Sequence, residues 1–298
     1  MPFEEAKVYY DGSHYIAIPH TEGPPKKSSR KPPEETIIVG EKETTRKELF
    51  EDLYAEAEGK TKRSKQKEIR EKMQEFFEDK QDAAMFVEEN LERKKRNMDC
   101  RRIRMFRKAA LQEFNYFCTF TYDPQKMDEV TFKKKLSYVF RHRAHRNGWK
   151  YIGVWERSPE AKRLHFHGIF YIPEGTMPGA LEEKTDYSFA DARKRKTLQC
   201  VYFADRFGRN VFAPLGKDEI PKTMVYLLKY IEKTEERIVY SKGLPQYFIS
   251  DIMDDDVICR YGTGDAKLLL RDDFACYDQG EYKGQVAPEV IAEMRKEN

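Results

Sequence analysis

The sequence predicts an α+β protein, because segments with the pattern of charged helices alternate with segments that have the pattern of aromatic strands. Residues 62–112 contain no glycine or proline, and apolar residues recur there at helical spacing. Residues 114–123, 151–158 and 164–172 are short runs rich in aromatic and β-branched residues, which are typical of strands. A helical pattern returns at residues 221–236.

Length and composition exclude several classes of protein. The chain has 298 residues, of which 36% are charged and 13% aromatic. This apolar content can build a core, so a wholly disordered chain is excluded. No run approaches the roughly 18 consecutive apolar residues of a membrane-spanning helix, and the N-terminus has no secretory pattern. With a net charge of +3, any contact with nucleic acid must come from local clusters of basic residues.

The cysteines indicate a reducing compartment. The five of them are widely spaced and include no C-x-x-C pair. They therefore predict neither a disulfide framework nor a cysteine zinc site, and we expect the protein to act in the cytoplasm.

Changes in composition and residue pattern divide the chain into four regions. Residues 1–35 combine a hairpin signal, two β-prone runs about an Asp-Gly turn, with a linker rich in Pro, Ser and Lys. Residues 36–112 form a charged helical region. Residues 113–252 hold the strands and the motifs that carry chemistry. Residues 253–298 are an acidic tail segment that the pattern does not place.

Local signals mark the limits of individual elements. Gly59 is expected to separate two helices of the charged region. Asp128 is a candidate N-cap and Gly148 a candidate stop for one further helix, and Pro221 suits the first turn of the last helix. Residues 173–210 look rich in loops.

The strongest chemical signal is the pair His165 and His167. Side chains alternate between the two faces of a strand, so both imidazoles project to one side. Neutral imidazole is the commonest metal ligand, and two neighbouring rings form a chelating pair. The alternative is two histidines that lie half exposed on a strand and bind nothing.

Glu156 adds a carboxylate to this pair. It ends the preceding strand, and pairing of the two strands as a hairpin would bring it beside the imidazoles. Two histidines and one carboxylate, with open positions left, suit Mg²⁺ or Mn²⁺. The alternative is a surface carboxylate that pairs with Arg157 or Arg163.

A third element is the run Tyr226-Leu-Leu-Lys229-Tyr230. On a helix, positions i, i+3 and i+4 lie on one face, so two phenols and an ammonium group point the same way. The tyrosines would lie about one turn, roughly 6 Å, apart along the axis. Leu227 could supply the core face of the helix instead, which would leave the tyrosine face free. The alternative is that the tyrosines form a stripe that packs against the rest of the protein and has no part in catalysis.

Basic residues gather in clusters that suit nucleic acid. Nine of the residues from Arg93 to Lys108 are basic, and clustered Lys and Arg displace counterions from phosphates. Interleaved Phe and Tyr could stack on bases. The alternative is a solvated surface. The candidate DNA-binding residues are Arg101, Arg102, Lys133, Lys134, Arg141, Arg143, Arg146, Arg193 and Arg195.

In combination these motifs resemble the HUH endonucleases, specifically the rolling-circle replication initiators of plasmids, integrative elements and small single-stranded DNA phages. FCTFTYD at 117–123 is similar to the opening strand of that family. LHFHGIF is similar to its His-hydrophobic-His strand, and YLLKYIEK to its two-tyrosine helix, in the family's order. The resemblance covers about residues 113–252. It implies a central antiparallel sheet that carries the histidines, with helices packed on it. The charged helical residues 36–112 would then be an N-terminal extension of this fold.

The resemblance implies metal-dependent, site-specific nicking and rejoining of single-stranded DNA. The two histidines and Glu156 would hold Mg²⁺ or Mn²⁺. Tyr226 would attack the scissile phosphate and form a 5′-phosphotyrosine, while Lys229 could help to stabilise the phenolate. Tyr230 would perform the second attack that rejoins the strand.

The resemblance also implies partners. The substrate would be single-stranded DNA at a replication origin in a bacterial host cell. No G-x-x-x-x-G-K-[ST] motif occurs, so a host helicase is expected, together with a polymerase that extends the free 3′-OH. A two-tyrosine transposase with the same chemistry and a catalytically inactive DNA-binding regulator of the same fold stay open as alternatives. The sequence determines neither the nick site nor the oligomeric state.

Overall fold

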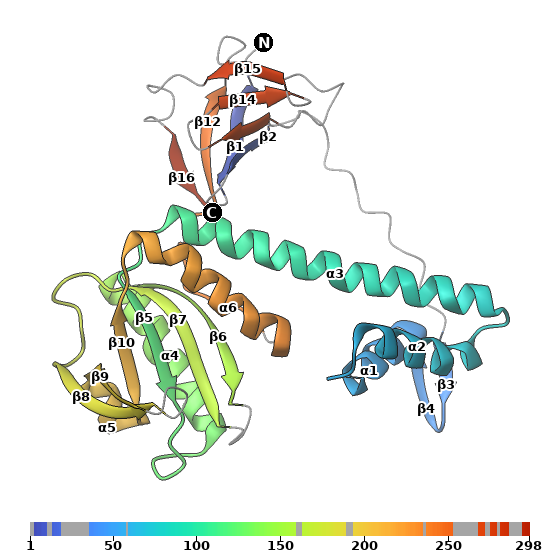
Figure 1. Cartoon of the computed structure of the whole chain (residues 1–298), viewed down its shortest axis with the longest axis horizontal. Helices are drawn as coiled ribbons and strands as arrows, with labels where there is room; N and C mark the ends of the chain where they lie inside the picture. The colour runs from blue at the N-terminus through green and yellow to red at the C-terminus, as the bar shows by residue number, and fades with distance from the viewer. Residues whose placement is uncertain are drawn as a thin grey trace. The chain divides into compact units, whose positions relative to one another are not determined.

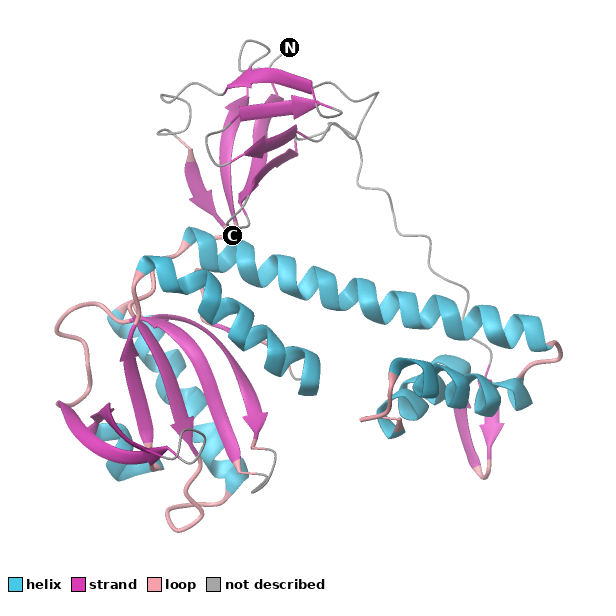
Figure 2. Ribbon diagram, viewed as in Figure 1, coloured by secondary structure: helices cyan, strands magenta, loops and turns pink. Residues whose placement is uncertain are grey.

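The computed structural model has a mixed α+β architecture with antiparallel sheets and a helical N-terminal region, which confirms the predicted fold class (Figure 2). The structure describes residues 3–10, 14–18, 36–57, 59–158, 163–188, 193–234, 237–252, 268–271, 275–278, 281–285 and 294–298. The chain divides into two compact units, Glu22–Arg101 and Met1–Thr21 with Arg102–Asn298. None of the helices in the described ranges combines the length and the apolar character needed to cross a bilayer.

In the unit Glu22–Arg101, the described residues from 36 onward form a β-hairpin followed by a small helical assembly. Its core contains Phe50, Ile69, Met73 and Val87. Gly59, with a φ of +82°, lies between the first two helices as predicted. The hairpin at its start differs from the expectation of a purely helical region. The elements are β3 (Thr36–Val39), β4 (Lys42–Thr45), α1 (Arg46–Glu56), α2 (Lys62–Met73), η1 (Gln74–Phe76) and α3 (Lys80–Leu111), which continues into the other unit.

A five-stranded antiparallel sheet forms the centre of residues 113–252, as predicted (Figure 1). The strand order is β10-β5-β7-β6-β11, so β7 is the middle strand. The strands are β5 (Tyr116–Thr121), β6 (Lys150–Arg157), β7 (Leu164–Tyr171), β10 (Asn210–Pro214) and β11 (Val239–Tyr240). The helices are α4 (Glu129–Asn147), α5 (Val201–Phe207) and α6 (Ile220–Thr234), with a short η2 (Lys217–Glu219) before the last.

The expectation that residues 173–210 are mainly loop is wrong. This segment contains a long two-stranded hairpin of β8 (Leu181–Ser188) and β9 (Arg193–Cys200), and then α5 and the start of β10. Among the strands that the structure describes, these two pair with each other alone. Their charged residues lie on both faces, so the segment lacks the alternation by which a half-buried strand is recognised.

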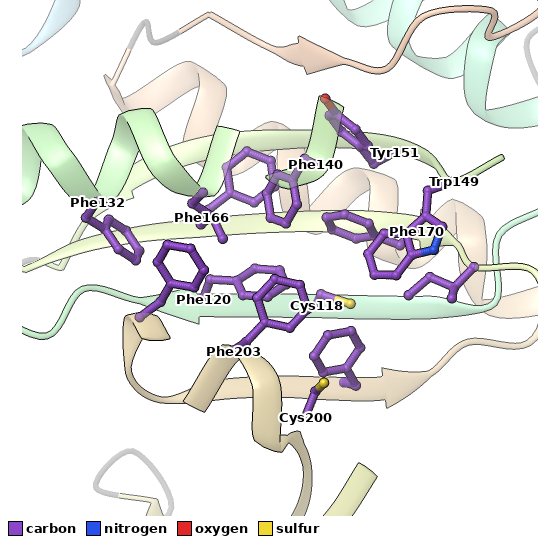
Figure 3. Close-up of a cluster of buried hydrophobic side chains, with 14 of the residues drawn as sticks. Cys118, Phe120, Phe132, Phe140, Trp149, Tyr151, Phe166, Phe170, Cys200 and Phe203 are labelled. Atoms are coloured by element: carbon purple, nitrogen blue, oxygen red, sulfur yellow. The ribbon is translucent and has the colours of Figure 1, made fainter. Parts of the chain in front are cut away.

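The core lies on one face of the central sheet. Aromatic rings from the strands and from α4 and α5 fill it, and Figure 3 shows them gathered in one cluster. Phe120, Phe166 and Phe170 come from the sheet, Phe140 from α4 and Phe203 from α5, and all five are at most 1% exposed. Because side chains alternate along a strand, the histidines on either side of Phe166 belong to the opposite face.

The limits of α4 follow the predicted signals. The Asp128 side chain accepts a hydrogen bond from the backbone N–H of Thr131 at 2.9 Å, so it is the N-cap. Gly148 ends the helix in the left-handed conformation with a φ of +71°. The buried residues Phe132, Leu136 and Phe140 lie four positions apart and form the stripe that packs on the sheet.

Two glycines opposite each other on β6 and β7 make room for the aromatic core. Gly153 pairs with Gly168. A Cβ on Gly153 would lie 2.4 Å from a ring carbon of Phe166, and one on Gly168 would lie 2.8 Å from the carbonyl oxygen of Ile152. The glycine that directly follows His167 is therefore required by close packing.

Strands from both ends of the chain share a seven-stranded sheet of order β15-β14-β13-β2-β1-β12-β16. The predicted N-terminal hairpin is present as antiparallel β1 and β2, although Asp11 and Gly12 fall outside the described residues. Segments expected to be a separate N-terminal piece and a separate tail thus belong to one sheet. The strands are β1 (Phe3–Tyr10), β2 (His14–Ile18), β12 (Tyr247–Ile252), β13 (Leu268–Arg271), β14 (Ala275–Asp278), β15 (Glu281–Gln285) and β16 (Arg295–Glu297).

Gly168→Ala tests the packing of the two central strands. The added methyl group would press on backbone atoms of β6, so we expect the free energy of unfolding to fall by about 1–3 kcal/mol. Gly216→Ala is the matched control, because a Cβ there meets only an ordinary contact at 3.5 Å. Denaturant unfolding measures both changes, and equal midpoints for the two variants would contradict the close approach.

Candidate active site

Strand β7, which carries the two histidines, is the middle strand of the sheet and pairs with β5 on one side and with β6 on the other. On one side, β5 places Thr119 opposite His167 and Thr121 opposite His165. On the other side, β6 places Glu156 opposite His165. Residues opposite each other in an antiparallel pair share a face, so all five side chains project from the face away from the aromatic core.

Each imidazole is held by a threonine hydroxyl of β5. Oγ1 of Thr119 is hydrogen-bonded to Nδ1 of His167 at 3.1 Å, and Oγ1 of Thr121 to Nδ1 of His165 at 3.1 Å. The two rings lie 5.7 Å apart between centroids and are inclined by 23°. Because Nδ1 of each ring is engaged, any further ligand or substrate of the rings would have to bind at Nε2.

Glu156 lies against the second histidine. Its Oε2 atom is 3.0 Å from Nε2 of His167, and the two residues are 7% and 8% exposed. The alternative of a surface carboxylate paired with arginine is therefore wrong, because Arg157 pairs instead with Glu129. The predicted proximity of this carboxylate to the histidine pair is present.

The environment favours a neutral imidazole at His165. Burial is the largest cause, and the nearby His167 adds to it, so that the pKa of His165 is lowered from 6.5 to about 4. Glu156 opposes this shift only in part. Arg163 and Arg209 also lower this pKa through their positive charge. Two cations therefore act on the histidine pair from nearby.

The donor set has the chemistry expected for a divalent ion, namely neutral imidazole and carboxylate. Within the described ranges, however, no three His, Cys, Asp or Glu side chains form a group that could hold a metal ion. The direct contact from Glu156 to His167 uses the ring nitrogen that would otherwise face an ion. The metal centre at His165, His167 and Glu156 therefore stays a prediction.

Helix α6 brings a tyrosine to the histidine face. The helix packs against β6 and β7, and its Met224 and Leu227 are buried. Tyr226 is 43% exposed, and its ring meets the Phe117 ring edge-on at 5.8 Å. The Phe117 ring in turn lies nearly parallel to that of His167 at 6.3 Å. One aromatic ring thus lies between the candidate nucleophile and the candidate ligand.

The other two residues of the tyrosine motif are only partly defined. Lys229 is exposed on α6. The backbone of Tyr230 belongs to the same helix, but its side chain lies outside the described residues. The roles of Lys229 and Tyr230 stay predictions.

Sequence reasoning missed the residues that orient the site. Phe117, Thr119 and Thr121 alternate along β5 and therefore share a face, and Arg209 directly precedes β10. The signal for the threonines was their spacing of two, which matches the spacing of the histidines. It becomes decisive only when the register between the strands is known.

The predicted DNA-binding residues are not gathered around the histidines. Helix α4, which carries five of them, packs on the opposite face of the sheet. Lys133, Lys134, Arg141 and Arg146 are exposed there, while Arg143 is half-buried. On β9, Arg195 is exposed and the side chain of Arg193 lies outside the described residues, while Arg101 and Arg102 are half-buried on α3. Contact of these residues with DNA stays a prediction.

Removal of one threonine hydroxyl tests the orientation of the rings. Thr121→Val keeps the branched shape but loses the hydrogen bond to Nδ1, so we expect the ¹⁵N shifts of the His165 ring to move toward those of free imidazole. The exposed Thr185 supplies the control variant, Thr185→Val. Histidine ¹⁵N NMR measures both, and unchanged His165 shifts in Thr121→Val would exclude a positioning role.

The shifted pKa of His165 predicts a pH dependence in metal-free protein. The unfolded chain binds this proton near pH 6.5 and the folded chain only near pH 4, so stability is lost as the pH falls through that interval. An NMR titration should find the His165 midpoint near 4. In His167→Gln the midpoint should rise yet stay below 6.5, since burial remains. A wild-type midpoint at 6.5 or above would refute the buried environment.

Comparison with known proteins gives one match. Residues 115–235 match the model of a family described as replication-associated protein ORF2/G2P. No curated protein and no solved structure matches the chain significantly. The matched range begins one residue before β5 and ends one residue after α6, so it includes both histidines, Glu156 and Tyr226. Over this range the chain is similar to replication-associated proteins, which supports a role in the initiation of DNA replication.

Proposed function

We propose that the protein nicks and rejoins single-stranded DNA at a replication origin, through a covalent link between a tyrosine and the 5′-phosphate. The observation that carries this proposal is that Tyr226 lies on the same face of the sheet as His165, His167 and Glu156. The match to replication-associated proteins over the same residues supports it.

Tyr226 is the nucleophile of the first step. Its phenolic oxygen attacks the scissile phosphorus, the bond from phosphorus to the 3′-oxygen breaks, and a 5′-phosphotyrosine and a 3′-oxygen result. The phenol gives its proton to a base, and the departing 3′-oxygen takes up a proton to become a 3′-OH. The number of phosphodiester bonds is conserved, so attack by a 3′-OH can reverse the step and rejoin the strand.

The neighbouring residues stabilise the charge that develops on the phosphate. Neutral phenol is a weak nucleophile and needs activation, and the exposed Lys229 on the same helix can stabilise the phenolate. Arg163 and Arg209, whose charges act on His165, can face the phosphate oxygens. Electrostatic groups fixed on a sheet need little reorganisation during the reaction.

The histidine pair and Glu156 would hold Mg²⁺ or Mn²⁺. When bound, such an ion would supply Lewis acidity at the scissile phosphate. Thr119 and Thr121 would keep each Nε2 directed toward it, because their hydroxyls engage Nδ1. Binding would replace the direct contact between Glu156 and His167. Titration with Mn²⁺ followed by electron paramagnetic resonance, compared between wild type and Glu156→Ala, measures this without any catalytic readout.

A covalent adduct with labelled origin DNA tests the nucleophile. Wild type with Mn²⁺ should give a protein–DNA band on a denaturing gel. Tyr226→Phe should reduce its rate of formation at least about a thousandfold, since it removes the attacking oxygen. Tyr230→Phe should retain the first adduct and its reversal by a 3′-OH, but lose the second tyrosine attack that ends a round of replication.

Tyr151→Phe is the matched control, because Tyr151 lies in the core on the opposite face of the sheet. Adduct that persists in Tyr226→Phe and disappears in Tyr230→Phe would assign the first attack to Tyr230. Tight binding of origin DNA by wild type without any adduct would instead indicate a DNA-binding regulator.

A further inference from the structure

A pocket of about 650 Å³ lies between α4 and α5, on the side of the central sheet away from the histidines. Figure 1 shows both helices beside the sheet. The proposed function does not use this pocket. Its volume falls in the range typical of sites for small ligands, roughly 300–1,000 Å³. Its lining residues are Lys126, Met127, Lys135, Tyr138, Val139, His142, Arg143, Tyr202, Arg206 and Phe207.

The charge of the pocket has one sign. Its charged lining residues are Lys126, Lys135, Arg143 and Arg206, all basic. Three of them have neutral partners. Lys126 donates to the carbonyl oxygens of Ala204 and Asp205 at 2.7 and 2.9 Å. Arg143 donates to the Asn147 side chain at 3.3 Å, and Arg206 to the Tyr202 hydroxyl at 2.7 Å. Their positive charge is therefore not cancelled within the pocket, and an anion is the complementary ligand.

Aromatic rings lie among these cations. Tyr138 and His142 are one turn apart on α4, with ring centroids 6.1 Å apart and planes inclined by only 26°. Tyr138 is 62% exposed, so its ring is not needed by the core. A flat exposed ring beside a second parallel ring offers a stacking surface to a planar ligand.

Tyr202 holds the two guanidinium groups in place. Arg206 lies over its ring at 4.2 Å and Arg143 at 5.8 Å. Planar guanidinium groups fixed in this way lose less rotational freedom when they bind a phosphate. The pocket thus combines prepositioned phosphate donors with an aromatic platform.

We propose that this pocket binds a nucleotide of single-stranded DNA, with the base stacked on Tyr138 and the phosphate held by Lys135, Arg143 and Arg206. The combination of basic groups and stacking rings is the one by which proteins hold unpaired strands. A duplex does not fit this chemistry, because its bases are paired and stacked on one another. The inference depends on the proposed function for its choice of DNA, but it concerns binding and not cleavage.

Such a contact would hold a flanking part of the strand on the face opposite the nucleophile. Retention of the strand would then not depend on the covalent bond. Binding and chemistry can for this reason be measured separately, and failure of one does not imply failure of the other.

The test compares two double variants by fluorescence anisotropy with a labelled oligothymidylate. Lys135→Glu/Tyr138→Ala changes exposed groups of the pocket. Val130→Ala/Lys242→Glu makes the same change in charge at exposed positions outside it. We expect the pocket variant to bind about tenfold more weakly than the control variant, in line with the loss of one stacked base and one phosphate contact. For the pocket variant, the slope of log affinity against log salt concentration should be shallower than for the control variant by about 0.7.

Three outcomes decide the proposal. Equal affinity of the two double variants would overturn it. With saturating origin DNA, the pocket variant should form the covalent adduct as fast as the control variant, which separates this site from the nicking site. Thymidine 5′-monophosphate should compete only at far higher concentration than the oligonucleotide, and competition at equal concentration would identify a free nucleotide as the ligand instead of a strand.

A second measurement does not depend on the folding of variants. Wild-type protein is irradiated with an oligonucleotide that contains 4-thiothymidine, and the adduct is mapped by mass spectrometry. We expect a cross-link at Tyr138 or His142. Cross-links confined to the histidine face of the sheet would contradict the pocket.

Discussion

The antiparallel register between β5 and β7 is the constraint on which the site depends. It places Thr119 opposite His167 and Thr121 opposite His165, and both hydroxyls reach Nδ1 at 3.1 Å. A slip of one residue would turn both hydroxyls toward the aromatic core. The register is held from that core, because a slip would remove Phe120 from the aromatic cluster, and burial of such a side chain contributes about 1.5–3 kcal/mol. The geometry of the polar face is thus fixed by packing on the apolar one.

The middle strand serves two purposes through the alternation of its side chains. Phe166 and Phe170 point into the core, while His165 and His167 point away from it. The crowding of the rings is relieved by Gly168, which faces the glycine of β6. A strand in which every second residue is locked in a close-packed core gives the intervening residues little freedom, which is what the proposed phosphate chemistry requires.

Much of this arrangement could be predicted from local sequence, and the rest depends on pairing between distant segments. Period-two alternation predicted that His165 and His167 share a face, which the structure confirms. Helical spacing left open whether Tyr226 faces solvent or only packs, and this residue is 43% exposed. The contacts of Thr121 with His165 and of Phe117 with the tyrosine link residues that are far apart in the chain. The β8–β9 hairpin escaped prediction because its charges follow no period, and the seven-stranded sheet because its strands come from both ends of the chain.

The two faces of the central sheet also differ in their electrostatics, and α4 explains how. Its inner stripe of Phe132, Leu136 and Phe140 is committed to the core, so its lysines and arginines lie on the outer side and beside α5. On the histidine face, Arg163 and Arg209 act on His165, and burial keeps His165 neutral. A dense basic cluster there would hold a nucleic acid strand by many contacts, of which only one would lie at the reacting phosphate. In the proposed mechanism, the histidine face needs only the charges that act at the reacting phosphate, while the outer face of α4 carries the charge that would hold the rest of the strand.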